Sequence, residues 1–168
     1  MNSIKFKIPT FQGRNDPDAY LEWERKIELI FACHNYSEEK KVKLVVVEFS
    51  RYASIWWNQL TINRRRNLER PISTWQELRQ IMRKRYIPSH YYRDLFRQLQ
   101  VLTQGNRSVE EYYMEMETLL MKVDLKEEDE VIMARFLNGL NRDIADKVEL
   151  QHYMDLDEMY QMALKFEG

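Results

Sequence analysis

The apolar residues of this chain recur mostly at spacings of three and four, the period of one face of an α-helix. Asp16 and Pro17 suit the N-cap and the first position of a helix that we expect to run to about Cys33. The stripe that this helix would bury consists of Tyr20, Trp23, Ile27, Ile30 and Phe31.

The same period continues through the first half of the chain. Ser37 is the expected N-cap of a second helix, and a break near Ser50 separates that helix from a further apolar repeat. Within that repeat we interpret Trp56 as a core residue and Trp57 as a side chain that could cover a groove or a partner.

A polar tract at 63–72 predicts a loop ahead of the next helix. Thr74 and Glu77 form a capping-box pattern at the start of that helix, and Pro88 is expected to end it. The first half therefore predicts a helical unit that closes at about residue 88.

The second half of the chain shows the same helical spacing of apolar residues, with different residues at those positions. A stripe from Tyr92 to Leu102 predicts a helix that ends before Gly105, a residue suited to the left-handed turn after a helix. Ser108 and Glu111 form another capping box at the start of the next apolar face. Further helices are expected over 131–139, around 144–148 and over 156–166.

Composition fits an all-helical chain. Four glycines and four prolines among 168 residues are too few for a fold built on tight turns. The single Cys33 excludes a disulfide framework, and no apolar run approaches the roughly 20 residues that cross a bilayer. We expect a reducing, aqueous location, the cytoplasm, and no membrane partner.

Charge is unevenly distributed, although the net charge is only −1. Residues 64–97 hold ten basic and three acidic side chains, a balance of +7, whereas residues 108–168 hold six basic and sixteen acidic ones, a balance of −10. Both regions could be ordinary solvated helix faces. They could also steer subunits toward each other, or the basic region toward a polyanion.

No residue pattern indicates catalysis or a cofactor. The three histidines are far apart and none belongs to a ligand-spaced pair, so we expect no metal. The sequence contains neither a glycine-rich phosphate loop nor a nucleophile elbow. We therefore expect a protein that is not an enzyme and takes no small-molecule substrate.

Five motifs follow one another along the chain: FQGRNDPDAYLEW, YASIWWNQL, STWQELRQIMRKRYIP, LTQGNRSVEEYYMEM and FLNGL. In this order they resemble the Gag capsid domain of gypsy-type LTR retrotransposons, closest in style to plant elements. That family is related to retroviral capsids and to the Arc protein. The resemblance implies an all-α fold of two small helical lobes joined by a short linker, with an N-terminal lobe at 1–88 and a C-terminal lobe at 89–168.

The stretch TQGNRSVEEYYMEMETLL is similar to the major homology region of retroviral capsids. The resemblance places Gln104 and Gly105 at its Gln-Gly pair, Tyr112 at its helical aromatic position, and Met116 where a Phe is usual. Ser108 departs from the Glu expected nearby, but as an N-cap it could accept a hydrogen bond from a backbone N–H. We interpret these five residues as a packing motif that ties the loop to the lobe core.

The function implied by the resemblance is structural: many copies would assemble into a virus-like particle, a closed shell that encloses the element's RNA. Small lobes with surplus aromatic residues could bury them between subunits, and heterologous contacts generate rings where the rotation closes. The contact residues expected from the sequence are Tyr20, Trp57, Tyr153, Met154 and Met159.

RNA is a possible second partner. Arg64, Arg65 and Arg66 could line the shell interior and hold phosphates without sequence preference. Gag proteins of this family usually carry a zinc knuckle after the capsid. With one Cys this chain does not contain that module, which we expect in a following segment.

A monomeric or low-oligomer peptide-binding module is the alternative function. The first lobe of Arc, which the N-terminal lobe resembles, holds short hydrophobic peptides in a groove. Tyr20, Trp23 and Trp57 would line such a groove here. A DNA-binding domain is disfavoured because the net charge is slightly negative and no basic recognition helix stands out.

Overall fold

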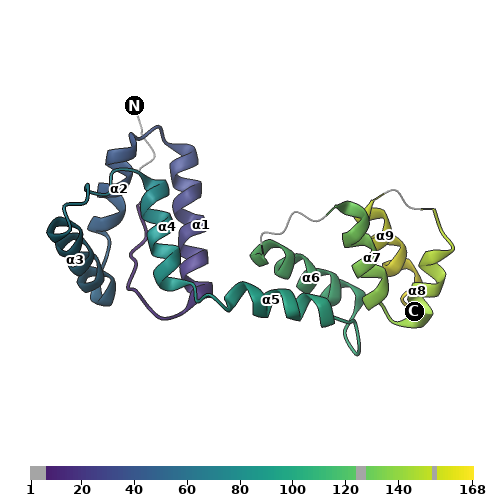
Figure 1. Cartoon of the computed structure of the whole chain (residues 1–168). Coiled ribbons are helices and arrows are strands. Elements are labelled where there is room, and N and C mark those ends of the chain that lie inside the picture. Colours follow the sequence, from purple (N-terminus) through teal and green to yellow (C-terminus); the bar gives the residue numbers. More distant parts are fainter. Residues whose placement is uncertain (1–6, 124–127, 153–154) are drawn as a thin grey trace. The chain divides into compact units, whose positions relative to one another are not determined.

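The computed structural model describes residues 7–123, 128–152 and 155–168, and every regular element in these ranges is an α-helix (Figure 1). The chain forms two compact units, Met1–Ser89 and His90–Gly168, which we call the N-lobe and the C-lobe. The predicted all-α fold of two small helical lobes is confirmed.

The helices of the N-lobe begin where the sequence places their caps. Asp16, Ser37 and Thr74 each accept a hydrogen bond from the backbone N–H three residues further on, which satisfies a donor that the first turn of a helix leaves free. The described part of the lobe contains α1 (Pro17–Cys33), α2 (Glu38–Val47), α3 (Arg51–Arg66) and α4 (Trp75–Tyr86).

Aromatic rings fill the centre of the N-lobe. The ring of Phe11, in the extended segment before α1, lies 4.8 Å from the rings of both Trp23 and Tyr86, and Tyr20 stacks on Tyr86 at 5.9 Å. Backbone hydrogen bonds hold Phe11 beside the α2–α3 junction, where it forms an isolated parallel bridge with Phe49. Local sequence alone does not predict this bridge, because its two partners are far apart in the chain.

Charged groups join α1 to α4 beside this aromatic core. Glu24 is only 4% exposed and accepts from Arg83 at two points, Nη2 at 2.5 Å and Nε at 2.9 Å. One turn further on, Glu28 accepts from Arg79 Nη1 at 2.6 Å and from Trp75 Nε1 at 3.0 Å. These paired carboxylates fix the register of the two helices.

Helix α3 extends beyond its predicted end. The tract at 63–72 was expected to be a loop, but α3 continues through Arg66, so that prediction is wrong for residues 63–66. The reason is that no Gly or Pro interrupts the chain between Ser50 and Pro71, and Arg is a good helix former. Within α3 only Ala53 is fully buried. Trp56, interpreted from the sequence as a core residue, is half-buried, with its ring 5.4 Å from the ring of Tyr86.

The C-lobe packs around α6, which contacts both α5 and α9, and α7 in turn contacts α8 and α9. Its core includes Tyr112, Met116 and Phe136, all at most 1% exposed, and the rings of Tyr113 and Tyr160 stack at 3.9 Å. The helices in the described part are α5 (Tyr91–Val101), α6 (Val109–Val123), α7 (Asp129–Gly139), α8 (Arg142–Glu149) and α9 (Leu156–Phe166).

Candidate functional site

A buried glutamine holds the loop between α5 and α6. Gln104 is 2% exposed, and its Nε2 donates to the carbonyl oxygen of Arg107 at 3.0 Å. Its Oε1 accepts from the backbone N–H of Asn141 at 3.0 Å, while its own N–H donates to the carbonyl of Gly139 at 2.8 Å. One side chain therefore joins this loop to the turn between α7 and α8.

Gly105 and Ser108 complete the turn into α6. Gly105 has φ +57°, a left-handed conformation in which a side chain would be strained, although open space surrounds it. Ser108 Oγ accepts from the N–H of Glu111 at 3.1 Å and donates to the carboxylate of Glu111 at 3.2 Å. The Glu167 carboxylate accepts from the N–H of Val109 at 2.7 Å, so a residue next to α6 and a residue near the C-terminus both satisfy the first turn of α6.

Tyr112 connects α6 to the end of α7. Its hydroxyl donates to the carbonyl of Phe136 at 3.0 Å, and burial raises the pKa of this hydroxyl to about 12. Gly139 leaves room for that hydroxyl, because a Cβ at position 139 would lie 1.9 Å from it. With Met116 buried on the same helix, all five residues of the expected packing motif lie together in the C-lobe.

The sequence does not reveal the partners of this motif. Gly139 and Asn141 follow Gln104 by more than thirty positions. Gly139 lies in the FLNGL motif, but nothing in that motif specifies which loop contacts it. All the polar contacts described for Gln104, Ser108 and Tyr112 are made within the lobe, which fits packing rather than chemistry.

Two of the expected assembly residues lie in the interior of their own lobes. Tyr20 is fully buried in the N-lobe and Met159 is 1% exposed in the C-lobe, so neither side chain offers a surface to a second copy. Both sit on the apolar stripe that packs their helix, which is the physical reason for this correction. Trp57 is half-buried and remains accessible in part, and Tyr153 and Met154 lie outside the described residues.

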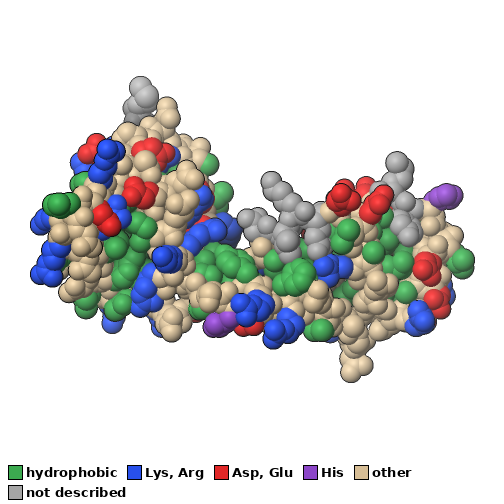
Figure 2. All heavy atoms as spheres, in the orientation of Figure 1, with side chains coloured by type: hydrophobic (Ala, Val, Ile, Leu, Met, Phe, Trp, Pro, Cys, Tyr) green, Lys and Arg blue, Asp and Glu red, His purple; other side chains and the backbone are tan. Residues whose placement is uncertain are grey.

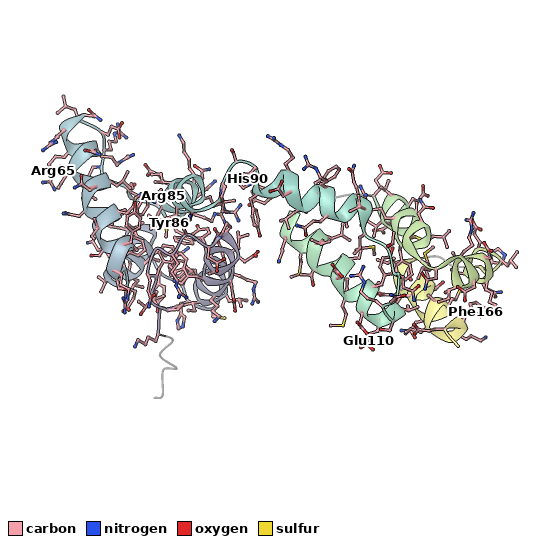
Figure 3. The ribbon with its side chains drawn as sticks, turned by 90° about the horizontal axis from the view of Figure 1, so that it is seen from below. Arg65, Arg85, Tyr86, His90, Glu110 and Phe166 are labelled. Atoms are coloured by element: carbon pink, nitrogen blue, oxygen red, sulfur yellow. The ribbon has the colours of Figure 1, made fainter. Side chains whose placement is uncertain are left out.

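The three arginines expected to face RNA differ from one another. Arg64 pairs with the carboxylates of Glu69 at 3.3 Å and Glu77 at 3.1 Å, so its charge is already compensated within the N-lobe. This corrects its assignment to a free basic patch. Arg65 and Arg66 are exposed at the C-terminal end of α3, where Figure 3 labels Arg65.

A hollow of about 450 Å³ lies beside Trp57, between α3 and the loop that follows it. Leu68, at 94% exposure, Pro71 and Ile72 supply its other apolar walls, and Arg65 adds a charge. Of the three residues expected to form a peptide groove, the hollow contains Trp57, whereas Tyr20 and Trp23 are buried elsewhere in the lobe.

Exposed apolar residues occur on several helices, among them Leu29 on α1, Val47 on α2 and Val101 on α5, and α3 and α6 each carry two of them. On α3, Tyr52 and Ile55 are 43% and 62% exposed, and on α6, Met114 and Met121 are 56% and 75% exposed. Figure 2 shows hydrophobic side chains between basic and acidic ones on both lobes. A search for apolar positions on the polar face of each predicted helix would have found them.

Other classes of site find no support in residues 7–123, 128–152 and 155–168. No group of three His, Cys, Asp or Glu side chains in these ranges is arranged to hold a metal ion. No helix in the same ranges combines the length and apolar character needed to span a bilayer.

Comparison with known proteins assigns each lobe separately. Residues 5–87 match the N-terminal capsid-like domain of the retrotransposon-derived protein PEG10, and residues 96–168 match the C-terminal capsid-like domain of PEG10/RTL1. A comparison with curated protein sequences finds no match.

Solved structures share the fold of two helical lobes. The structure of the dArc2 capsid is 17% identical, with a TM-score of 0.74 over 99% of this chain and 98% of that one. The structure of the dArc1 capsid is also 17% identical, with a TM-score of 0.61 over 95% of this chain and 93% of that one. At this identity the likeness establishes the fold.

The two helical lobes in this order define a Gag-like capsid protein. Within that class, the lobes of this chain belong to the capsid-like domain families of PEG10 and RTL1.

Proposed function

We propose that this protein is the structural capsid protein of an LTR retrotransposon of the gypsy type, or of a gene derived from one. Copies of the chain assemble in the cytoplasm into a virus-like particle that encloses RNA. The N-lobe and the C-lobe act as the two lobes of each subunit, and no chemical step is assigned to either of them.

The observation that carries this proposal is the presence of both capsid-like lobes, in capsid order, along almost the whole chain. Exposed apolar side chains on α3 and α6 support it further, because isolated lobes leave them in water whereas subunit contacts would cover them. The polar groups of the Gln104 loop are satisfied within the lobe, which suits a rigid building block.

Assembly is tested with the purified chain. Negative-stain electron microscopy and sedimentation velocity, at rising protein and salt concentration, should reveal discrete large particles of uniform size. RNA inside them should resist nuclease until the particles are dissociated. A chain that stays monomeric under all these conditions would rule the proposal out.

RNA contact is assigned to Arg65 and Arg66, the two exposed members of the expected basic patch. Replacing both with Ala should weaken binding of single-stranded RNA and reduce the slope of log K against log salt by roughly 1.4, about 0.7 per phosphate contact. The matched control replaces Arg25 and Lys26, two exposed basic residues of α1. Equal losses in both variants would mean that the patch has no special role.

The hollow beside Trp57 supports the alternative, a peptide-binding module of low oligomeric state. In that case a short apolar peptide would insert a side chain against Trp57 and Ile72. Fluorescence titration of the monomer with such peptides should then saturate, and Trp57→Ala should abolish the signal. Particle formation without saturable peptide binding favours the shell.

A further inference from the structure

Two exposed helix faces have matching apolar spacing and opposite charge. On α3 the stripe at spacings of three and four runs through Tyr52, Ile55, Gln59, Ile62 and Arg66. On α6 the corresponding stripe runs through Glu110, Met114, Glu117 and Met121. We call these the α3 stripe and the α6 stripe.

The α3 stripe lies opposite the contact that holds its helix. Ala53 is the buried residue of α3, whereas Ile55 is 62% exposed, Ile62 is half-buried, and Gln59 and Arg66 are exposed. Arg85 donates to the hydroxyl of Tyr52 at 2.8 Å and adds positive charge at one end. The sequence of α3 contains four arginines and no acidic residue.

The α6 stripe likewise faces away from the core of the C-lobe. The buried side of α6 carries Tyr112, Met116 and Leu119, whereas Met114 and Met121 are 56% and 75% exposed. Glu110 and Glu117 alternate with these methionines and are exposed as well; Figure 3 labels Glu110 at the start of the helix.

The apolar residues of both stripes are seven positions apart. Ile55 and Ile62 on α3, and Met114 and Met121 on α6, are therefore each separated by roughly 10 Å along the helix axis, at about 1.5 Å per residue. Two helices with equal spacing can bring both apolar pairs into contact at once.

We propose that the α3 stripe of one copy packs antiparallel on the α6 stripe of a second copy. The inference rests on the proposed function and names the contact that links subunits. In this register Ile55 meets Met121 and Ile62 meets Met114. Gln59 lies opposite Glu117, and Arg66 lies opposite Glu110.

Charge selects this pairing over the alternatives. Two α3 stripes would bring arginines together and two α6 stripes would bring glutamates together, whereas the mixed pair places opposite charges face to face. The antiparallel direction also sets the basic end of α3 beside the acidic start of α6 and opposes the helix dipoles favourably. A contact between two different surfaces propagates from copy to copy, as rings and shells require.

Charge reversal tests the contact. Variant A carries Gln59→Glu and Arg66→Glu, and variant B carries Glu110→Lys and Glu117→Lys; all four positions are exposed, so both variants should fold. Each should associate at least about tenfold more weakly than the wild type, because like charges then face each other. Equimolar A and B should associate again, since A presents an acidic α3 stripe to the basic α6 stripe of B.

Sedimentation velocity on nuclease-treated protein provides the readout, so that lost RNA binding by the Arg66 variant is not mistaken for lost association. The control, Asp143→Lys with Asp146→Lys on exposed positions of α8, should associate like the wild type. Ile55→Ser, which removes apolar contact without changing charge, should weaken association in the same way as A and B.

The outcomes separate the two proposals. A wild-type chain that does not associate contradicts the proposed function, and with it this contact. A wild-type chain that associates while A and B do so equally well overturns the α3–α6 contact alone. The α3–α6 contact is also overturned if variant A associates more weakly while variant B does not, or if association does not recover when A and B are mixed. In either case the two stripes would not be partners.

Discussion

Gln104 and Tyr112 show how single side chains hold the C-lobe together. Each satisfies backbone groups near the α7–α8 turn, and the left-handed Gly105 and the close approach at Gly139 allow the chain to reach them. The Gln-Gly pair and the Ser108 cap could be read from the sequence because both signals are local. Their distant partners could not, since nothing in the residues around Asn141 specifies which loop it meets.

Replacing Gln104 with Ala should destabilise the C-lobe by about 1–3 kcal/mol, because the partly buried N–H of Asn141 and carbonyl of Arg107 lose their partner. Urea unfolding followed by circular dichroism measures the change. Gln98→Ala, an exposed substitution on α5, is the control and should have little effect. Equal stability of the Gln104 variant and the control would show that the buried amide is dispensable.

Buried tyrosines make the fold sensitive to alkaline pH. Burial is the main cause that raises the pKa of Tyr86, Tyr112 and Tyr113 to about 12, above the ordinary value near 10. The folded state then holds protons that the unfolded chain releases. Their contribution to stability is complete below about pH 10 and is lost as the pH rises through 12.

Stepwise urea unfolding should therefore show the free energy of unfolding falling between pH 10 and 12, while tyrosinate absorbance rises late. Tyr113→Phe should flatten part of that fall by removing one of the raised groups. A free energy of unfolding that does not change over this interval would contradict the assignment.

At the scale of elements, helix caps and breaks followed from local sequence, whereas the role of each helix face did not. Asp16 and Thr74 predicted the starts of α1 and α4, and both bonds are present. The apolar stripe of α1 did not reveal that Glu24 is buried beside it. The basic tract at the end of α3 was predicted to be a loop because its residues are polar. It is helical because no Gly or Pro interrupts it.

The Glu24–Arg83 pair gives a prediction for the α1–α4 contact. Arg83→Met removes the partner of a carboxylate that is 4% exposed. The free energy of unfolding of the N-lobe should therefore fall, by at most about 3–5 kcal/mol. The fall should be smaller than for a fully buried pair, because the Arg83 side chain is partly exposed to water. Adding Glu24→Gln should restore part of the loss. Thermal unfolding measures both variants, and Arg25→Met on the outer side of α1 is the control.

If the single and double variants unfold alike, the carboxylate is not the source of the cost. If Arg25→Met destabilises as much as Arg83→Met, the effect belongs to α1 generally rather than to the pair.

At the scale of the whole molecule, the sequence was most informative about the class of protein and its fold. Five weak motifs in one order predicted two helical lobes, and the matches to capsid-like domains agree with them. Residues at subunit contacts were the weakest part of the prediction, because aromatic character alone does not separate core from surface. Tyr20 and Met159 were expected at subunit contacts, but both lie on the apolar stripes that pack their helices and are buried. Met114 and Met121 lie on the opposite, exposed side of α6.

The central claim is that this chain is a subunit of a closed shell. Sedimentation velocity of the purified full chain over a wide concentration range, with negative-stain images of the same samples, tests it most directly. We predict a sharp transition from slow species to a single population of large closed particles. A monomer or a small fixed oligomer at every concentration and salt condition would contradict the account.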